Sequence, residues 1–179
     1  MKPWMALGIW KEDDVAWDRF DRSRIDPDLV NLVKAASLVE YNAPVYASYL
    51  CNVFHEYPEY QELARAWSDE EVRHGVTLGR WAKLADPDFD FEEAFKRFTG
   101  GFQVPVNLSQ SVRGSLTGEL LARCVVETGT SSHYTAIRRA TTEPVLHDLC
   151  HRLAADELRH YKTFYELSKL ARAKEGVNL

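Results

Sequence analysis

The sequence predicts an all-α protein, an antiparallel four-helix bundle with a long crossover between the second and third helices. Three observations support this prediction. Apolar residues recur at helical spacing over four long segments. Only nine Gly and seven Pro are present, and they cluster in a few places. Two short links and one long one join the segments, which suits two helical hairpins. The 179 residues are expected to form a single domain over 1–179.

The first helix is predicted over residues 27–55. Asp26 is a good N-cap, and Pro27 suits the first helical position. The inward face of this helix carries one acid, Glu40, in an otherwise apolar row. Pro44 removes the backbone donor that would bond the carbonyl of Glu40, which predicts a kink or a π-bulge beside this acid.

The other three helices are predicted over residues 58–85, 115–141 and 143–174. Each has an apolar row at helical spacing with an acid near its middle. The second helix starts at Pro58, and Gly176 lies just past the end of the fourth. The links within each half are short, so the first two helices and the last two are expected to be antiparallel neighbours.

Two further segments lie outside these helices. Residues 1–25 are rich in aromatic and charged side chains and are expected to form an N-terminal arm that covers part of the bundle. Residues 86–114 form the crossover, within which residues 91–98 are expected to make a short amphipathic helix that ends at Gly100 and Gly101. A connection of this length can cross the whole bundle.

Composition narrows the cellular context. The net charge is −5 without a basic block, which argues against nucleic acid as a partner. No apolar run approaches the roughly 18 residues of a membrane span, and no secretory signal is visible at the start. The three cysteines are odd in number and not closely paired, which indicates reduced thiols. The sequence therefore predicts a cytoplasmic protein without a membrane span.

Two short segments have nearly the same sequence, Glu70-Glu71-Val72-Arg73-His74 and Asp156-Glu157-Leu158-Arg159-His160. In a helix, Glu at position i and His at i+3 lie one turn apart on the same face, so both can reach one metal ion. The helix before each motif carries one acid on its own apolar face. Together they predict a centre for two metal ions with these ligands: Glu40, Glu71, His74, Glu127, Glu157 and His160.

Two alternatives compete with the metal centre. Roughly 0.5 Glu-x-x-His pairs are expected by chance in this composition, so two alone are weak evidence, and the six side chains could line a solvated groove. The spacing argues against chance, because 31 positions separate Glu40 from Glu71 and 30 separate Glu127 from Glu157. Burying four unpaired carboxylates would be very costly, whereas two divalent ions cancel their charge.

Asp148 and His151 also have the i, i+3 spacing of metal ligands, but they do not belong to the predicted centre. Asp148 precedes Glu157 by nine positions, which places it on roughly the opposite face of the helix at 3.6 residues per turn. We therefore expect this pair on the surface.

The ligand types indicate which metal is bound. Oxygen and nitrogen ligands without thiolate suit iron or manganese, whereas structural zinc usually takes four ligands at a single ion. The predicted cofactor is two Fe ions per chain, with Mn as the alternative in one or both positions. Six side chains shared between two ions leave coordination positions open, where O₂ or peroxide would bind.

Over residues 27–172, these features resemble the ferritin-like di-iron carboxylate superfamily. The sequences of residues 67–75 and 154–160 are most similar to the ligand motifs of acyl-carrier-protein desaturases, and rubrerythrin-type bundles are the other close comparison. The chain lacks the additional helices of the desaturases and the rubredoxin module of the rubrerythrins. The resemblance implies a ferritin-like arrangement of the bundle and, as a partner, a second copy in a homodimer.

The resemblance also implies hydrogen bonds that orient the ligands. Asp156 would accept a bond from the distal ring nitrogen of His74, and Glu70 would do the same for His160, which fixes each ring. The alternative for Glu70 and the nearby arginines is an ion pair on the helix surface.

The resemblance also implies a role for Thr130, which lies three residues after Glu127. A Thr in this position borders the oxygen-binding pocket of O₂-activating members, which makes Thr130 a candidate catalytic residue. The alternative is a hydroxyl that bonds back to a helical carbonyl, which is common.

The expected function is an oxidoreductase that activates O₂ or peroxide at a di-iron or Mn/Fe carboxylate centre, supplied by an external electron donor. A hydrophobic substrate is expected by analogy. The main alternative is iron handling, in which a ferroxidase or storage protein has Fe(II) as its substrate and an acidic route for it. A third is a structural bundle with a stable metal pair, which would not react with O₂.

Overall fold

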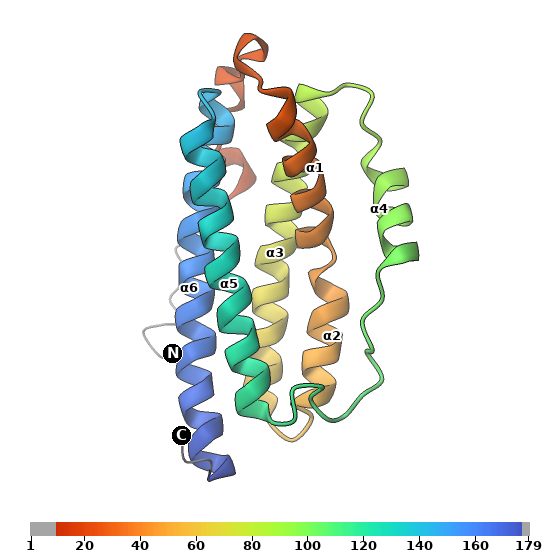
Figure 1. The fold of residues 1–179 in the computed structure, drawn as a ribbon, viewed down its shortest axis with the longest axis vertical. Helices are drawn as coiled ribbons and strands as arrows, with labels where there is room; N and C mark the ends of the chain where they lie inside the picture. Colours follow the sequence, from red (N-terminus) through yellow and green to blue (C-terminus); the bar gives the residue numbers. More distant parts are fainter. Residues whose placement is uncertain (1–9, 177–179) are drawn as a thin grey trace.

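The computed structural model describes residues 10–176, which contain helices and no β-strand. The α-helices are α1 Pro27–Tyr41, α2 Ala43–Val53, α3 Pro58–Ala85, α4 Phe91–Gly101, α5 Leu116–Ala140 and α6 Pro144–Glu175. They form a helical bundle in which α3 packs beside α1 and α2, α5 packs beside α6, and α3 joins the two hairpins through α6, while α4 stands outside (Figure 1). None of these helices combines the length and apolarity that a membrane crossing needs.

Local chemistry sets the helix ends. The Asp26 carboxylate caps α1 by accepting from the backbone N–H of Asp28 at 2.9 Å. Ser115 caps α5, and Glu143 caps α6 by accepting from two backbone N–H groups. The last helix ends at Gly176, whose φ of 64° is left-handed and suits glycine. These caps satisfy donors that the first turn of a helix leaves unpaired.

Three of the predicted helices lie where the sequence places them. The bounds of α3 agree with the prediction of 58–85, and those of α5 and α6 differ by one residue at each end. The single helix predicted over 27–55 is two helices that meet at Asn42 and end at Val53. Pro44 has no N–H for the carbonyl of Glu40, and in place of the expected kink or π-bulge the helix is interrupted at the single residue Asn42.

The break lies at a close approach of α1 to α3. A Cβ added at Gly75 of α3 would lie 2.6 Å from the backbone nitrogen of Tyr41 and 2.8 Å from its Cα. Only glycine allows this approach, because atoms of a backbone cannot rotate away. The contact holds the last turn of α1, and with it Glu40, against the middle of α3.

Gly75→Ala is therefore expected to destabilise the fold by about 1–3 kcal/mol, the usual cost of overpacking. Chemical denaturation followed by circular dichroism measures this. The matched control is Gly129→Ala in α5, where an added Cβ meets nothing within 4 Å. That variant should gain up to about 1 kcal/mol from helix propensity. Equal effects of the two substitutions would contradict the close approach.

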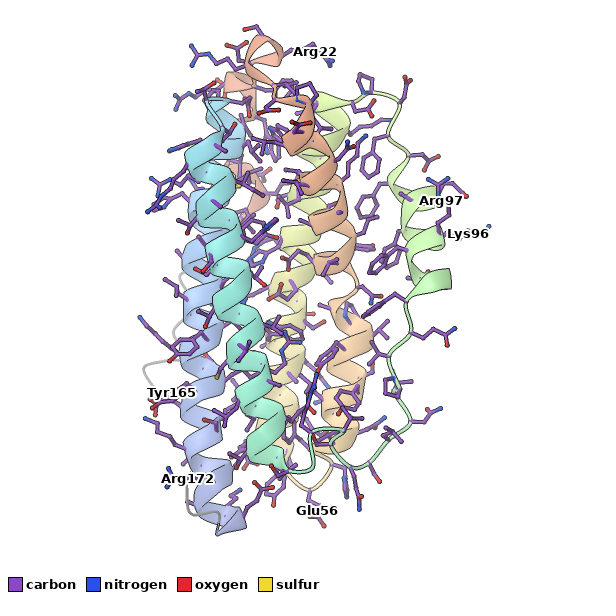
Figure 2. The ribbon with its side chains drawn as sticks, in the orientation of Figure 1. Arg22, Glu56, Lys96, Arg97, Tyr165 and Arg172 are labelled. Atoms are coloured by element: carbon purple, nitrogen blue, oxygen red, sulfur yellow. The ribbon has the colours of Figure 1, made fainter. Side chains whose placement is uncertain are left out.

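The crossover carries α4, an 11-residue helix that is longer than the predicted 91–98. Its aromatic face turns toward the bundle, where the rings of Phe91 and Phe95 lie 5.2 and 4.9 Å from that of Tyr41. Lys96 and Arg97 point away from the bundle (Figure 2). This amphipathic division explains why the crossover runs along α1.

The arm preceding α1 consists of three 3₁₀ turns, η2 Glu12–Asp14, η3 Trp17–Arg19 and η4 Arg22–Arg24. Trp10 and Val15 are buried in the same apolar cluster as residues of α3 and α6. The arm thus covers part of the bundle from residue 10 onward, and residues 1–9 of the predicted arm lie outside the described residues.

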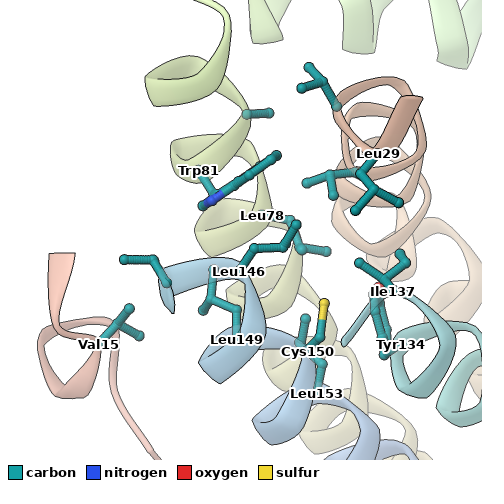
Figure 3. Close-up of a cluster of buried hydrophobic side chains, with 14 of the residues drawn as sticks. Val15, Leu29, Leu78, Trp81, Tyr134, Ile137, Leu146, Leu149, Cys150 and Leu153 are labelled. Carbon is teal, nitrogen blue, oxygen red and sulfur yellow. The ribbon is translucent and has the colours of Figure 1, made fainter. Parts of the chain in front are cut away.

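Two apolar clusters divide the interior of the bundle. One surrounds Trp81 and includes Leu78, Leu146 and Leu149 (Figure 3). The other lies toward the opposite end and includes Leu50, Phe54, Trp67, Leu120 and Phe164. Between the two clusters every long helix contributes a buried acid, and α3 and α6 add a histidine each. The apolar clusters seal this polar layer from both ends of the bundle.

Candidate metal centre

The six predicted ligands meet in the polar layer. Two groups of side chains have ligand atoms that all lie within 4.8 Å of one another. One group is Glu40, Glu71, His74 and Glu157, and the other is Glu71, Glu127, Glu157 and His160. The six side chains come from α1, α3, α5 and α6 and are all buried. Either group could hold a metal ion, and two carboxylates belong to both.

The shared carboxylates present one oxygen to each group. Nδ1 of His74 lies 3.6 Å from Oε2 of Glu71 and 3.3 Å from Oε1 of Glu157. Nδ1 of His160 lies 2.9 Å from Oε1 of Glu71 and 3.8 Å from Oε2 of Glu157. Glu71 and Glu157 are therefore placed to bridge two ions. Glu40 and Glu127 each serve one group, with oxygens 4.0 and 3.4 Å from the nearer histidine Nδ1.

Several of these ligand atoms are buried and lie close to one another, yet none of them forms a hydrogen bond of acceptable geometry within the described part of the chain. Among the described residues, the buried atoms without a partner include Nδ1 of both histidines and one oxygen each of Glu71, Glu127 and Glu157. Unpaired buried polar groups are rare in folded proteins because each costs about 1–3 kcal/mol. Their convergence on one point, in a donor set of four carboxylates and two imidazoles, fits divalent metal ions.

The outer nitrogen of each ring faces a carboxylate. Nε2 of His74 lies 3.0 Å from Oδ2 of Asp156, which also accepts from Nε1 of Trp10 at 2.8 Å. Nε2 of His160 lies 3.3 Å from Oε2 of Glu70. These are the pairs that the resemblance implies, and the contact of Trp10 extends one of them. Hydrogen bonds of this kind orient the rings so that Nδ1 points at the ligand cluster.

The repeated arginines connect the two outer carboxylates. Arg159 donates to Glu70 at 2.8 and 3.2 Å and to Asp156 at 2.5 Å. Arg73 lies 3.5 Å from the same two carboxylates. Each arginine pairs with the acid three positions before it on its own helix and also with the acid of the facing helix, and the sequence gives no sign of this second contact. Two cations thus balance two acids that would otherwise repel each other.

Charge and hydrogen bonding shift the acidity of the outer acids. Burial alone would raise the pKa of Asp156, but its bonds to His74 and Trp10 and the charge of Arg159 lower that pKa to about 2. In the same way, His160 and Arg159 outweigh burial and lower the pKa of Glu70. Both carboxylates therefore stay ionised and hold a proton on the outer nitrogen of each ring.

Without a metal ion, protons hold the cluster together. Burial, followed by the charges of neighbouring carboxylates, raises the pKa of Glu40 well above its ordinary range. Burial likewise raises the pKa of Glu127 to about 7. Burial would lower the pKa of His74 and His160, but the acids around them outweigh it and raise both pKa values well above the ordinary range. Metal binding must displace these protons.

Glu40 and Glu127, the two carboxylates that serve one ligand group each, make contacts that the sequence does not predict. Nη2 of Arg123 donates to Oε1 of Glu127 at 3.1 Å, and the hydroxyl of Tyr134 donates to Oε1 of Glu40. Arg123 stands four positions before Glu127 on α5, so the i, i+4 spacing is the signal that could have found it. Tyr134 reaches Glu40 across two helices, and no local spacing predicts that.

Thr130 is half-buried, and its hydroxyl donates to the carbonyl of Val126 at 3.0 Å. This bond to a carbonyl of its own helix is the alternative that the sequence offers for Thr130. Thr130 nevertheless lines the same cavity as Glu127, so it lies at the border of the open space. Asp148 and His151 lie at the surface, as predicted. Asp148 pairs with Arg152 at 2.8 Å, and His151 is exposed.

A cavity of about 620 Å³ opens onto the ligand cluster between α1, α2 and α5. Glu40, Glu71, Glu127 and Glu157 line it, and neither ligand histidine does. Most other lining residues are apolar, and several reach the surface, such as Val39 at 59% and Val125 at 74% exposure. A small molecule can therefore approach from the carboxylate side through an apolar opening.

Fold and geometry together define a helical-bundle protein with two overlapping, buried groups of carboxylate and histidine ligands that could hold metal ions. Comparison of the chain with protein-family models, with curated proteins and with solved structures finds no match.

Proposed function

We propose that this protein is a ferritin-like oxidoreductase that uses a di-iron carboxylate centre, or its Mn/Fe equivalent, to activate O₂ or peroxide. The observation that carries the proposal is the convergence of unpaired buried ligand atoms from two overlapping groups. Two iron ions, when bound, supply electrons and open coordination positions for the reduction of O₂ or peroxide. The protein contributes the ligands, fixed ring orientations and a pocket with a mostly apolar lining.

The residues around the centre support redox chemistry at a fixed pair of ions. The arginines and acids that join α3 to α6 hold both histidine rings in place, which suits ions that remain bound through a reaction. Tyr134 and Arg123 position the two carboxylates that serve one group each. A preorganised ligand set of this kind keeps the reorganisation on changing oxidation state small.

The nature of the cavity favours an oxidoreductase over iron handling. A protein whose substrate is Fe(II) needs a polar route for a hydrated cation, since desolvating an ion in an apolar passage is costly. The rim of this cavity is formed by Leu32, Val39, Phe102, Val125 and Val126, all of which are exposed. Such a rim suits O₂ and an apolar substrate.

Anaerobic loading with Fe(II), followed by O₂, tests the proposal. We expect about two irons per chain, as the two ligand groups indicate, and a change in the near-ultraviolet spectrum when O₂ is admitted. Repeated additions of Fe(II) should not accumulate oxidised iron on the protein. Binding of fewer than two irons would refute the site, and an unchanged spectrum would refute the redox function. Oxidation of many irons per chain would instead support the iron-handling alternative.

A further inference from the structure

The cavity above the ligand cluster is elongated. Its lining runs along α1 and α2 from Leu32 to Tyr46 and along α5 from Tyr134 to Arg123. The first two helices run opposite to α5 (Figure 1). The guanidinium of Arg123 lies 4.6 Å from the ring of Tyr46, so these two residues mark one end of the lining, and Leu32 lies toward the other. At 1.5 Å per residue, the 14 positions from Leu32 to Tyr46 correspond to roughly 20 Å. An extended molecule therefore fits this shape better than a compact one.

Among residues 10–176, Arg123 is the only arginine or lysine that lines the cavity. It is 7% exposed, and its guanidinium lies 4.6 Å from the ring of Tyr46 and 5.0 Å from the ring of Trp67. One amino group donates to Glu127, while Nε is buried and has no acceptor. The aromatic rings fix a cation with unused donor capacity at one end of the cavity.

Metal ions would neutralise Glu127, the carboxylate to which Arg123 donates, and leave Arg123 without an ion-pair partner. Four carboxylates and two divalent ions cancel, and the outer acids Glu70 and Asp156 are balanced by two arginines. Glu119, the other buried acid near Arg123, attracts it electrostatically but accepts its hydrogen bonds from the hydroxyls of Tyr46, Tyr49 and Ser111 and, among the described residues, forms no ion pair with Arg123. A buried cation beside an open cavity favours an anion as its partner.

We propose that the Arg123 end of the cavity binds the carboxylate head group of an elongated, apolar substrate. This inference rests on the proposed function, because the metal ions must occupy Glu127 before Arg123 turns its charge to a ligand. The guanidinium fork matches a carboxylate, and the apolar rim between α1 and α5 accepts the tail. The substrate class is thus a carboxylic acid with an extended apolar body.

Binding of octanoate and 1-octanol to the full chain loaded with Zn(II) tests this inference without turnover. The two probes share a tail and differ in the charge of the head group. Calorimetry, with the intrinsic tryptophan fluorescence as a second readout, should show octanoate binding at least about tenfold more tightly, as expected for a charged hydrogen-bonded pair. Arg123→Gln should reduce this preference to less than about threefold, and Arg123→Lys should retain part of it because the charge remains.

Two controls show whether position matters. Arg139→Gln removes an exposed charge from the same helix, and His133→Gln changes a histidine of the cavity lining that lies toward the other end of the cavity. Both should keep the preference for octanoate. A preference that survives in Arg123→Gln, or disappears in His133→Gln, would overturn the proposal, because the head group would then bind the metal ions or the opposite end. Failure of the native chain to take up Zn(II) would refute the metal site itself.

Discussion

Glu157→Ala is expected to abolish binding of both metal ions, whereas Glu40→Ala and Glu127→Ala should each remove only one. The reason is that Glu157 presents an oxygen to each ligand group, while Glu40 and Glu127 belong to one group each. Glu71→Ala should behave like Glu157→Ala, since Glu71 is shared in the same way. Loss of a direct ligand should weaken the affected ion by more than about 100-fold, beyond the loss typical of an outer partner.

Equilibrium dialysis against Co(II) with elemental analysis measures these stoichiometries. Asp148→Ala is the control, since this acid has ligand spacing to His151 but pairs with Arg152 at the surface. It should bind two ions, as the native chain does. If Glu40→Ala and Glu157→Ala lost the same number of ions, the assignment of shared and unshared carboxylates would be wrong.

The stability of the metal-free protein is expected to fall as the pH rises from about 4.5 to 8. The folded state raises the pKa of Glu127 from 4.5 to about 7 and that of Glu40 well above 4.5, so it binds protons more tightly than the unfolded chain. Their stabilisation is complete below pH 4.5 and is lost as the pH passes through the raised values. The pKa values of His74 and His160 are also raised, so their contribution, complete below pH 6.5, is lost in the same direction.

For Glu127 alone, the change from 4.5 to about 7 corresponds to about 3 kcal/mol. Denaturation at a series of pH values, with a chelator present, measures the effect. Glu127→Gln should flatten part of the slope. Loading with Zn(II) should reverse the slope, because metal ions need deprotonated ligands. At lower pH the trend should turn, since the lowered pKa of Asp156 makes its contribution disappear between pH 3.8 and about 2.

Much of the helical organisation could be predicted from the sequence, because helix ends are set by local chemistry. Asp26 with Pro27, Pro58, and Gly176 mark ends that the structure reproduces to within a residue. For the break at Asn42, the sequence predicts only a kink or a π-bulge. Pro44 guarantees the loss of one hydrogen bond, but how far the chain then bends depends on the close packing of Tyr41 against Gly75.

The candidate site likewise has features that the sequence predicts and features that only the structure shows. The spacing of Glu and His puts each pair on one helix face, which is a local property, and the structure brings all six side chains together. The contacts of Arg159 with Glu70, and of Tyr134 with Glu40, run between helices. Their existence depends on the distance and rotation between helices, which no spacing within one helix specifies.

The sequence by itself determined the helices and the residue types of a candidate centre, because a period of 3.6 residues fixes which side chains share a face. Only the tertiary structure decided which carboxylates are shared, which cations balance the outer acids, and where the cavity opens. Shared ligation requires two oxygens of one carboxylate to face partners on different helices, as Glu71 and Glu157 do. That arrangement is set by packing across the bundle, which exists only once the chain has folded.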